Sequence, residues 1–425
     1  MTDPTLDAEG INESAVCDAT PSDITIVTYP FITSNAASTW TADSSSYGTD
    51  AAVLAYGTAA TAGTGATITI NDDGAGDPGS ISTSQNSSNG VFASMGGTVN
   101  ITDTVINTSG NYAHALAATY AGTLNINNVQ ALTTGDNSSV IATGIDGGYV
   151  TVAGGSYTAT SNGLRASGIR VAGTGSTVSV SDGTGSGTTI AAQNGSAVVI
   201  EGGNTVTINS NGSTSLSGAA GQQNNGIFLY QGTLGDATAG TGNFSMTNGS
   251  ISYTCDATLT PSCAGGMASS DQNNPATMFS VTNTTAIIAL TDVTVINDTP
   301  TSTNSNGTLL TSAALSQGVG GIVTFNAAGE TLTGDIVVDS ISTANVSLAA
   351  DTATPAVAST LTGAINAANN GGTVNLTLDA TSSWVAANGP SYLTSLTNAG
   401  TGNITCQTTS QCQVYVAGVL QASIQ

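Results

Sequence analysis

The sequence predicts an all-β protein, a right-handed parallel β-helix (β-solenoid) of roughly 13 three-strand coils with capping segments at its ends. Three observations favour this fold class. Ser, Thr, Asn, Gly and Ala dominate the chain, and Gly occurs 53 times, which is too often for long helices. Short strands with alternating apolar residues recur along the chain. Turn-forming residues separate these strands at regular intervals.

The repeat is clearest where a strand begins with Thr and alternates polar with apolar residues, as in Thr98–Thr102. Alternation with a period of two places the apolar side chains on one face and Thr, Ser or Asn on the other, so each copy predicts a half-buried strand. Successive copies lie roughly 25 to 28 residues apart, within the range of solenoid repeats. The corresponding apolar residues are Val99, Leu124, Val150, Val178 and Val206.

Two further segments in each period complete the predicted coil. Asn-Gly readily adopts positive φ and turns the chain, so a second strand is expected after each Asn-Gly. These dipeptides begin at Asn89, Asn162, Asn194, Asn225 and Asn306. A shorter third segment follows the main strand, for example around Tyr157 or Leu216. A hairpin-built sandwich is the alternative, since Asn-Gly also marks hairpins, but the constant phase of the repeat favours stacked coils.

Three regions are expected along the chain. An acidic segment with a cap or donor strand covers residues 1–60, the β-helix covers 61–330, and C-terminal coils with a cap cover 331–425. A solenoid leaves unpaired backbone edges on its terminal coils, so apolar end segments are expected to cap it or to pair with a second copy. The residues predicted for such self-assembly are Ile24, Ile26, Tyr29, Phe31, Val414, Tyr415 and Val416.

The charge balance narrows the classes of partner. Lys and Arg total 2 against 26 Asp and Glu, which gives a formal charge of −24, and the two basic residues are Arg165 and Arg170. So few cations cannot neutralise phosphates, and nucleic acid is therefore not expected as a partner. Because no apolar stretch of ~18 residues occurs, no transmembrane segment is expected.

Four of the five cysteines form two close pairs. Disulfides Cys255–Cys263 and Cys406–Cys412 are favoured over the crossed connectivities, and they indicate an oxidising compartment. A zinc site is the alternative, but neither pair has CxxC spacing and His114 is the only histidine. Cys17 is left over, either as a free thiol or as a bridge between chains. The sequence thus predicts a secreted protein, extracellular or at the cell surface.

One loop has a composition that suits a cation. Asp72, Asp73 and Asp77 lie together with Gly in the segment 71–77, and clustered carboxylates on a bending loop are typical of Ca²⁺ sites. The bidentate Glu that completes an EF-hand is absent, and a solvated turn is the alternative. No other cofactor is predicted.

The candidate catalytic residues of the sequence each have a non-catalytic alternative. Arg165 with Arg170 suggests a polysaccharide lyase, but the acidic chain would repel polyuronates. Asp72 with Asp73 suggests a glycoside hydrolase, but the Gly-His-Gly and Arg-Ile-Lys elements expected of hydrolases with this fold are absent from the sequence. His114 has no Ser or Cys motif to serve, which favours a packing or surface role. Outward Thr columns raise ice binding, yet those positions mix Thr with Asn, Ser and Tyr149. We therefore expect no enzymatic activity.

The C-terminal fifth of the chain carries a more specific pattern. The sequence Leu-Thr-Gly-x-Ile occurs at 332–336 and again at 361–365, followed by Asn-Leu-Thr-Leu-Asp at 375–379, Ser-Trp at 383–384 and Ser-Tyr-Leu at 391–393. This stretch resembles the C-terminal passenger region of pertactin-like autotransporter adhesins. The resemblance implies a right-handed β-helix displayed on, or released from, a microbial surface, with a role in adhesion or matrix contacts.

These observations together predict a non-catalytic extracellular structural protein. It is expected to be either a surface adhesin or the subunit of an extracellular fibre that stacks end to end through its terminal strands. Its predicted partner is a further copy of itself or a host or matrix surface. A carbohydrate-active β-helix enzyme, a lyase or a hydrolase, is the alternative function.

Overall fold

The computed structural model consists of two compact units. Unit 1 comprises residues 1–223 and 234–238, and unit 2 comprises residues 224–233 and 239–425. The residues described are 5–8, 14–20, 24–28, 31–34, 46–71, 78–154, 157–183, 187–219, 225–232, 237–254, 276–298, 307–314, 318–387, 389–401, 403–407 and 412–421. Each unit is a parallel β-helix, which confirms the predicted fold class.

Unit 1 has three parallel ladders, one on each side of its coils. Ladder 1A contains β2 (Val16–Asp18), β5 (Val53–Ala55), β8 (Val91–Ala93), β10 (Leu116–Ala118), β12 (Ile141–Thr143), β15 (Ile169–Val171) and β18 (Val198–Glu201). Ladder 1B contains β3 (Ile24–Thr28), β6 (Thr67–Asn71), the first halves of β9 (Thr98–Thr108) and β11 (Gly122–Thr133), β13 (Gly148–Ala153), β16 (Thr177–Ser181) and β19 (Thr205–Asn209).

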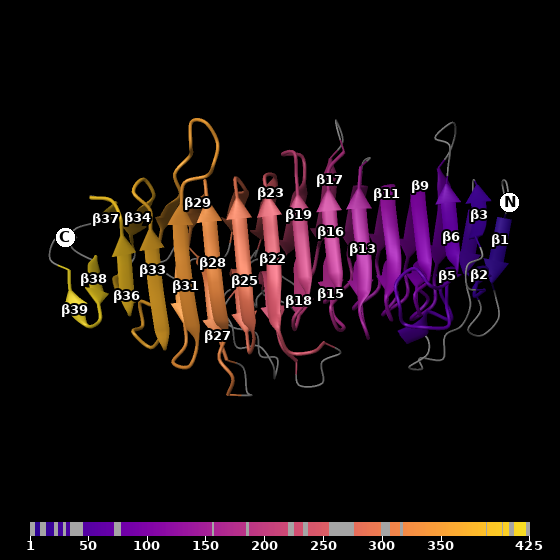
Figure 1. Ribbon diagram of the computed structural model, residues 1–425, viewed down its shortest axis with the longest axis horizontal. Coiled ribbons are helices and arrows are strands. Elements are labelled where there is room, and N and C mark those ends of the chain that lie inside the picture. The colour runs from indigo at the N-terminus through magenta and orange to yellow at the C-terminus, as the bar shows by residue number, and fades with distance from the viewer. Residues whose placement is uncertain are drawn as a thin grey trace. The chain divides into compact units, whose positions relative to one another are not determined.

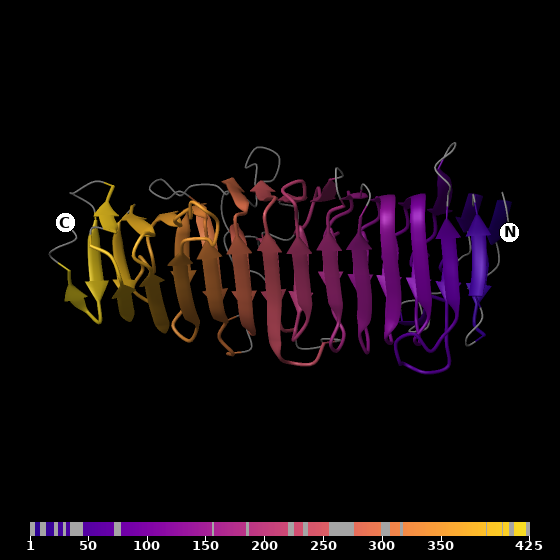
Figure 2. The same cartoon turned by 45° about the horizontal axis from the view of Figure 1, so that its top comes forward.

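Ladder 1C completes each coil of unit 1. It contains β1 (Thr5–Ala8), β4 (Phe31–Ser34), β7 (Gly79–Thr83), the second halves of β9 and β11, β14 (Tyr157–Ser161), β17 (Thr188–Ala192) and β20 (Ser215–Ala219). Figure 1 shows neighbouring strands of this unit, such as β13 and β16, side by side and parallel. In the turned view of Figure 2 the long purple strands β9 and β11 again lie next to each other.

The predicted repeat matches the register of ladder 1B. Val99, Leu124, Val150, Val178 and Val206 are consecutive partners in neighbouring strands. Each of these side chains is at most 1% exposed, so the repeated apolar position is a column of the core. The phase of the repeat was therefore predicted correctly, because burial allows only one register for a strand with a single apolar face.

One turn signal was misread. A strand is predicted after Asn162-Gly163, but β15 begins only at Ile169, and Leu164 is exposed. Gly163 instead follows β14 at a tight corner, where a Cβ atom would lie 1.8 Å from the carbonyl oxygen of Gly135. A Cβ atom at Gly135 would likewise lie 1.9 Å from the carbonyl oxygen of Gly110. This corner therefore requires glycine, because the backbones of neighbouring coils approach closely there.

Unit 2 repeats the architecture, with strands stacked in parallel ladders. Ladder 2A contains β21 (Asn225–Tyr230), β24 (Thr277–Thr282), β27 (Thr308–Ala313) and β30 (Asp335–Val338). Ladder 2B contains β22 (Thr241–Thr247), β25 (Thr285–Thr291), β28 (Ile322–Ala328), β31 (Thr343–Ala349), β33 (Thr373–Leu378) and β36 (Ser395–Asn398). On the third side β23 (Ser250–Thr254) pairs with β26 (Thr294–Asp298).

The third side of unit 2 continues with a four-stranded ladder, and a small sheet follows at the C-terminal end. The ladder contains β29 (Thr331–Thr333), β32 (Thr360–Thr362), β34 (Ser383–Ala386) and β37 (Ile404–Cys406). In the small sheet, β38 (Gln413–Val416) is parallel to β35 (Pro390–Leu393) and antiparallel to β39 (Val419–Leu420). The two Leu-Thr-Gly-x-Ile segments stack directly, with Leu332 opposite Leu361 and Ile336 opposite Ile365.

Candidate functional site

The outward surface of ladder 1B is built from uncharged polar side chains. From β6 to β19, one outward column is Thr67, Thr98, Thr123, Tyr149, Thr177 and Thr205, and the next is Thr69, Asn100, Asn125, Thr151, Ser179 and Thr207. We call these two columns the 1B face. Neither column contains an acidic side chain.

Hydrogen bonds between coils hold part of the 1B face in place. The Asn125 amide Nδ2 donates to Asn100 Oδ1 at 2.8 Å, and Asn100 Nδ2 donates to Thr69 Oγ1 at 3.3 Å. The side chains are thus ordered by their neighbours in the stack before any ligand arrives, which lowers the entropic cost of binding.

The corresponding columns of ladder 2B are interrupted by apolar side chains. Asn345 and Asn375 repeat the amide contact at 2.8 Å, and Ser395 donates to Asn375 at 2.6 Å. However, Ile287 and Ile322 occupy outward positions of this ladder and are 38% and 44% exposed. The two columns of the 1B face contain no such aliphatic side chain.

A pocket of about 230 Å³ lies on the outside of ladder 1A. Phe92, Ala117, Ala142 and Arg170 are consecutive cross-strand partners in β8, β10, β12 and β15, and all four line it. Two alanines between two large side chains leave a hollow in this column. Tyr112 and His114 border it on one side and Thr119 and Thr143 on the other, and we call it the His114 pocket.

His114 occupies a repeated position at a corner of the coils. Asn89 Oδ1 accepts the backbone N–H of His114 at 2.8 Å, and His114 Nδ1 accepts the N–H of Ser139 at 3.0 Å. Ser139 Oγ accepts the N–H of Ser167 in the same way at 3.3 Å. The ring is therefore fixed by the stack, and the neutral tautomer carries its proton on Nε2. The recurrence of Asn89, His114, Ser139 and Ser167 at coil spacing is the signal that sequence reasoning missed.

Electrostatics keep this histidine neutral. Burial lowers the pKa of His114 to about 4, and the nearby Arg170 charge acts in the same direction. Arg165, the other arginine of the chain, lies in an exposed turn with a φ of 55° and is not among the described residues that line the pocket.

Unit 2 brings together three carboxyl groups that sequence reasoning did not connect. The side chains of Asp292 and Asp351 share a hydrogen bond, which requires one proton between them. Glu330 is fully buried, and its Oε1 accepts the N–H of Val293 at 2.8 Å. Glycine at position 329 leaves room for the Asp292 carboxyl group, because a Cβ atom there would lie 2.3 Å from Asp292 Oδ1.

The pKa values of these acids follow from burial and mutual contact. Burial raises the pKa of Glu330 to about 7, with a further rise from Asp292 against the opposing effect of the Val293 N–H. Burial and the contact with Asp351 also raise the pKa of Asp292. Glycosidase carboxyl groups stand ~5 Å or more apart to admit the sugar, so the touching Asp292–Asp351 pair lacks that geometry.

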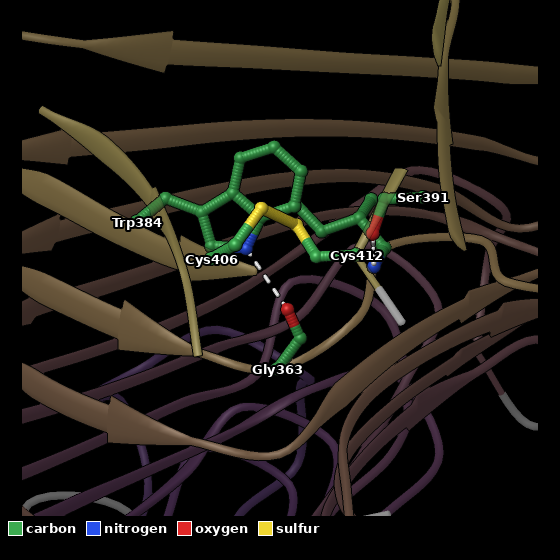
Figure 3. Close-up of a disulfide and its surroundings, with 6 residues drawn as sticks. Gly363, Trp384, Ser391, Cys406 and Cys412 are labelled. Atoms are coloured by element: carbon green, nitrogen blue, oxygen red, sulfur yellow. Dashed lines mark hydrogen bonds between the residues drawn. A yellow bond between two sulfur atoms is a disulfide. The ribbon is translucent and has the colours of Figure 1, made fainter. Parts of the chain in front are cut away.

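The predicted Cys406–Cys412 disulfide is confirmed. Its sulfurs are 2.02 Å apart, and Figure 3 shows it among the last coils with Trp384. Trp384 is fully buried, lies between Leu361 and Ile404 in its ladder, and donates its indole N–H to the Gly363 carbonyl at 2.9 Å. Cys406 lies on β37, which pairs with β34, the strand that contains Trp384.

Several residues of the predicted sites cannot be placed in the structure. Cys255, Cys263, Asp72, Asp73, Asp77 and Tyr29 lie outside the described residues. Within the described part of the chain, Cys17 is a free, exposed thiol on β2, and no group of His, Cys, Asp or Glu side chains is arranged to hold a metal.

The predicted self-assembly residues fall on strands that pair on one side or on both sides within their own unit. Ile24 and Ile26 are on β3, which pairs with β6, and Phe31 is on β4, which pairs with β1 and β7. Val414, Tyr415 and Val416 are on β38, between β35 and β39. No helix among the described residues is long and apolar enough to cross a membrane, as expected.

Comparison with known proteins identifies no relative. No family model, no curated protein and no solved structure matches the chain. The similarity to autotransporter passengers therefore stays a prediction, and the function is argued below from the surfaces of the molecule.

Proposed function

We propose that this protein is a non-catalytic extracellular adhesin whose 1B face binds neutral polysaccharide on a matrix or host surface. The observation that carries the proposal is the 1B face, two columns of Thr, Ser, Asn and Tyr with no charged member. Hydroxyl and amide groups match the hydrogen-bonding groups of a neutral glycan and cost less to desolvate than charges.

The repetition of the face supports binding to a polymer. Equivalent side chains recur at the strand spacing of about 4.8 Å, so a polymer lying along the stack meets the same groups several times. Weak contacts repeated along one rigid surface add up to useful avidity. The high negative charge of the rest of the chain disfavours anionic polymers.

One further observation supports the location. The Cys406–Cys412 disulfide is typical of proteins that work outside the cell. Stacking of copies into a fibre is the alternative form, and among the described strands β3 pairs on one side only, with β6.

The proposal is tested by adsorption of the purified protein to insoluble cellulose and chitin, with anionic alginate beads for comparison. Adsorption to at least one neutral polymer is expected, and Thr151→Glu should weaken it at least ~10-fold by burying a charge in the contact. Thr324→Glu, the same change on an outward strand position of ladder 2B, is the matched control and should have no effect.

Three results would overturn the proposal. The first is a lack of adsorption to every neutral polymer, and the second is equal adsorption of the Thr151→Glu variant and the unmodified protein. The third is release of soluble sugar from a polymer during incubation, which would favour a carbohydrate-active enzyme. Electron micrographs of the same preparation that show filaments would replace the adhesin with the fibre subunit.

A further inference from the structure

A pocket of about 310 Å³ lies at a corner of the last coils of unit 2, near β36 and β38 in Figure 1. It forms because the connections at this corner differ in length from coil to coil. Residues 366–372 form a loop before β33, whereas Thr394 alone connects β35 with β36 in the next coil. One coil later the hairpin turn Ala417–Gly418 follows β38. The short connection between two longer ones leaves a hollow, which we call the corner pocket.

Hydrogen bonds within the chain fix the walls of the corner pocket. Asn366 Oδ1 accepts the N–H of Gly371 at 3.0 Å, and its Nδ2 donates to the carbonyl oxygen of Tyr392 at 3.2 Å. The loop is thereby closed on itself and attached to the next coil. Thr394 Oγ1 accepts the N–H of Val374 at 3.0 Å. Because these contacts order the walls before a ligand arrives, the entropic cost of binding is low.

Two stacked tyrosines form one wall of the pocket. Tyr392 and Tyr415 are cross-strand partners on β35 and β38, and their ring centroids are 4.8 Å apart with 10° between the ring planes. Ser391 and Val414, the residues before them, are buried, so both tyrosine side chains stand on the outer face of the sheet. Both tyrosines line the pocket. The stack gives the pocket a rigid, largely apolar surface against which the C–H groups of a sugar ring can pack.

The polar groups of the pocket favour an uncharged ligand that carries hydroxyl groups. None of the described residues that line the pocket is charged, so an ionised ligand would lose water there without gaining an opposite charge. The exposed side-chain amide of Asn369 offers a donor and an acceptor, and it makes no hydrogen bond to another described residue. The Thr394 hydroxyl accepts from Val374 and still has its proton to donate. Sugar hydroxyls both donate and accept, and they match these groups.

From this arrangement we infer that the corner pocket binds one neutral sugar ring. Asn369 and Thr394 exchange hydrogen bonds with its hydroxyl groups, and the stack of Tyr392 and Tyr415 packs against its C–H groups. The volume of about 310 Å³ lies at the lower end of the range for small-ligand sites, which suits one ring better than a chain of them. The pocket lies within unit 2, so the inference does not depend on the 1B face of unit 1.

Saturation-transfer NMR measures this binding on the full chain. Methyl glucoside, methyl galactoside and N-acetylglucosamine are the probes, and glucuronate is the charged comparison. A saturable signal is expected with at least one neutral sugar, with a Kd of ~0.1–10 mM as for one small ligand. Glucuronate should bind at least ~10-fold more weakly than that sugar, because its carboxylate has no cationic partner in the pocket. No saturable signal with any neutral sugar, or equal binding of glucuronate, would overturn the inference.

Matched variants test the location of the site. Asn369→Gly removes the exposed amide and suits the φ of 52° at this position, so it should weaken binding ~3- to 10-fold without disturbing the fold. Asn137→Gly makes the same change at a φ of 56° in unit 1 and should leave binding unchanged. Equal affinities of the two variants would contradict the site.

Hydrogen exchange of the unmodified protein gives a second measurement that requires no variant. A saturating concentration of the sugar should slow exchange in peptides that cover residues 366–372 and 413–420, and it should not change exchange in β13 or β16 of unit 1. Slower exchange in unit 1 alone would exclude the corner pocket as the site.

The variants also distinguish this inference from the proposed function. Asn369→Gly should adsorb to neutral polysaccharide like the unmodified protein, because the 1B face is unchanged. Thr151→Glu should bind the single sugar normally. Loss of adsorption with intact binding of the single sugar concerns the 1B face alone, and the opposite result concerns the corner pocket alone.

Discussion

Half-buried His114 in unit 1 and fully buried Glu330 in unit 2 are two titratable groups whose pKa values shift in opposite directions. Burial lowers the pKa of His114 to about 4 and raises that of Glu330 to about 7. Each group is thus kept in its uncharged form well into the pH range where it would be charged in water. Burial is the largest cause of both shifts, with smaller effects of the Arg170 charge on His114 and of Asp292 on Glu330, so the same cause acts in opposite directions on a base and on an acid.

The largest expected effect is on unit 2 at high pH. The pKa of Glu330 is raised from 4.5 to about 7, so its contribution to stability is complete below 4.5 and is lost as the pH rises through 7. Glu330→Gln stays neutral and keeps an acceptor for the Val293 N–H. It should therefore stabilise unit 2 by about 2–3 kcal/mol at pH 8 and by much less at pH 4.

Hydrogen exchange resolves this effect by unit, since solenoids unfold in parts. Peptides of β25, β28 and β31 should gain protection in Glu330→Gln at pH 8, while peptides of unit 1 should not change. A variant that loses protection equally at pH 4 and pH 8 would show that the carboxyl group serves packing and not titration.

The second effect is on unit 1 at low pH. The unfolded chain protonates His114 near pH 6.5 and the folded chain only near 4, so stability is lost as the pH falls from 6.5 through 4. With a discount for the half-buried ring, the loss should reach about 2 kcal/mol at pH 4. His114→Asn keeps an acceptor for the Ser139 N–H and cannot titrate, so it should remove this pH dependence from unit 1.

Hydrogen exchange of β10, β12 and β15 at pH 7 and pH 4.5 measures this change, and Glu330→Gln in unit 2 is its control. If His114→Asn retains the full acid sensitivity, carboxylates of unit 1 cause it. Direct NMR titration of the one imidazole would then give a pKa near 6.5.

The parts of this comparison differ in how far sequence could predict them. The Val99 column was predictable because burial of one strand face at constant spacing permits one register. Leu164 was wrongly predicted to lie on a strand, because Asn-Gly occurs both before strands and at corners where two backbones approach closely. The close approach at Gly163 is visible only once the coils are stacked. Asp292, Glu330 and Asp351 have no common spacing, since loops of different lengths separate their coils. Their contact depends on tertiary structure alone.

The smallest effect compares one ionised carboxylate from each unit. Burial raises the pKa of Asp379, but the N–H groups of Ala350 at 2.6 Å, Ser382 at 2.7 Å and Thr381 at 2.9 Å outweigh it and lower the pKa. Burial also raises the pKa of Asp182, and hydrogen bonds that come mainly from hydroxyl groups outweigh this effect and lower the pKa. One of these donors is the Ser210 hydroxyl, at 2.6 Å from Asp182 Oδ2.

Backbone donors cannot turn away from an amide, whereas hydroxyls can rotate to suit it. Asp379→Asn should therefore cost about 1–2 kcal/mol in unit 2, and Asp182→Asn less than about 1 kcal/mol in unit 1. A carboxyl group whose pKa is lowered on folding stabilises the folded chain above its ordinary pKa of 3.8, and this stabilisation is lost as the pH falls further. The destabilisation by each Asp→Asn substitution should therefore be smaller in acid. Thermal unfolding of the two variants at pH 7 and pH 3 tests the order, and a larger loss from Asp182→Asn would mean that hydroxyl donors hold a carboxylate as firmly as the backbone does.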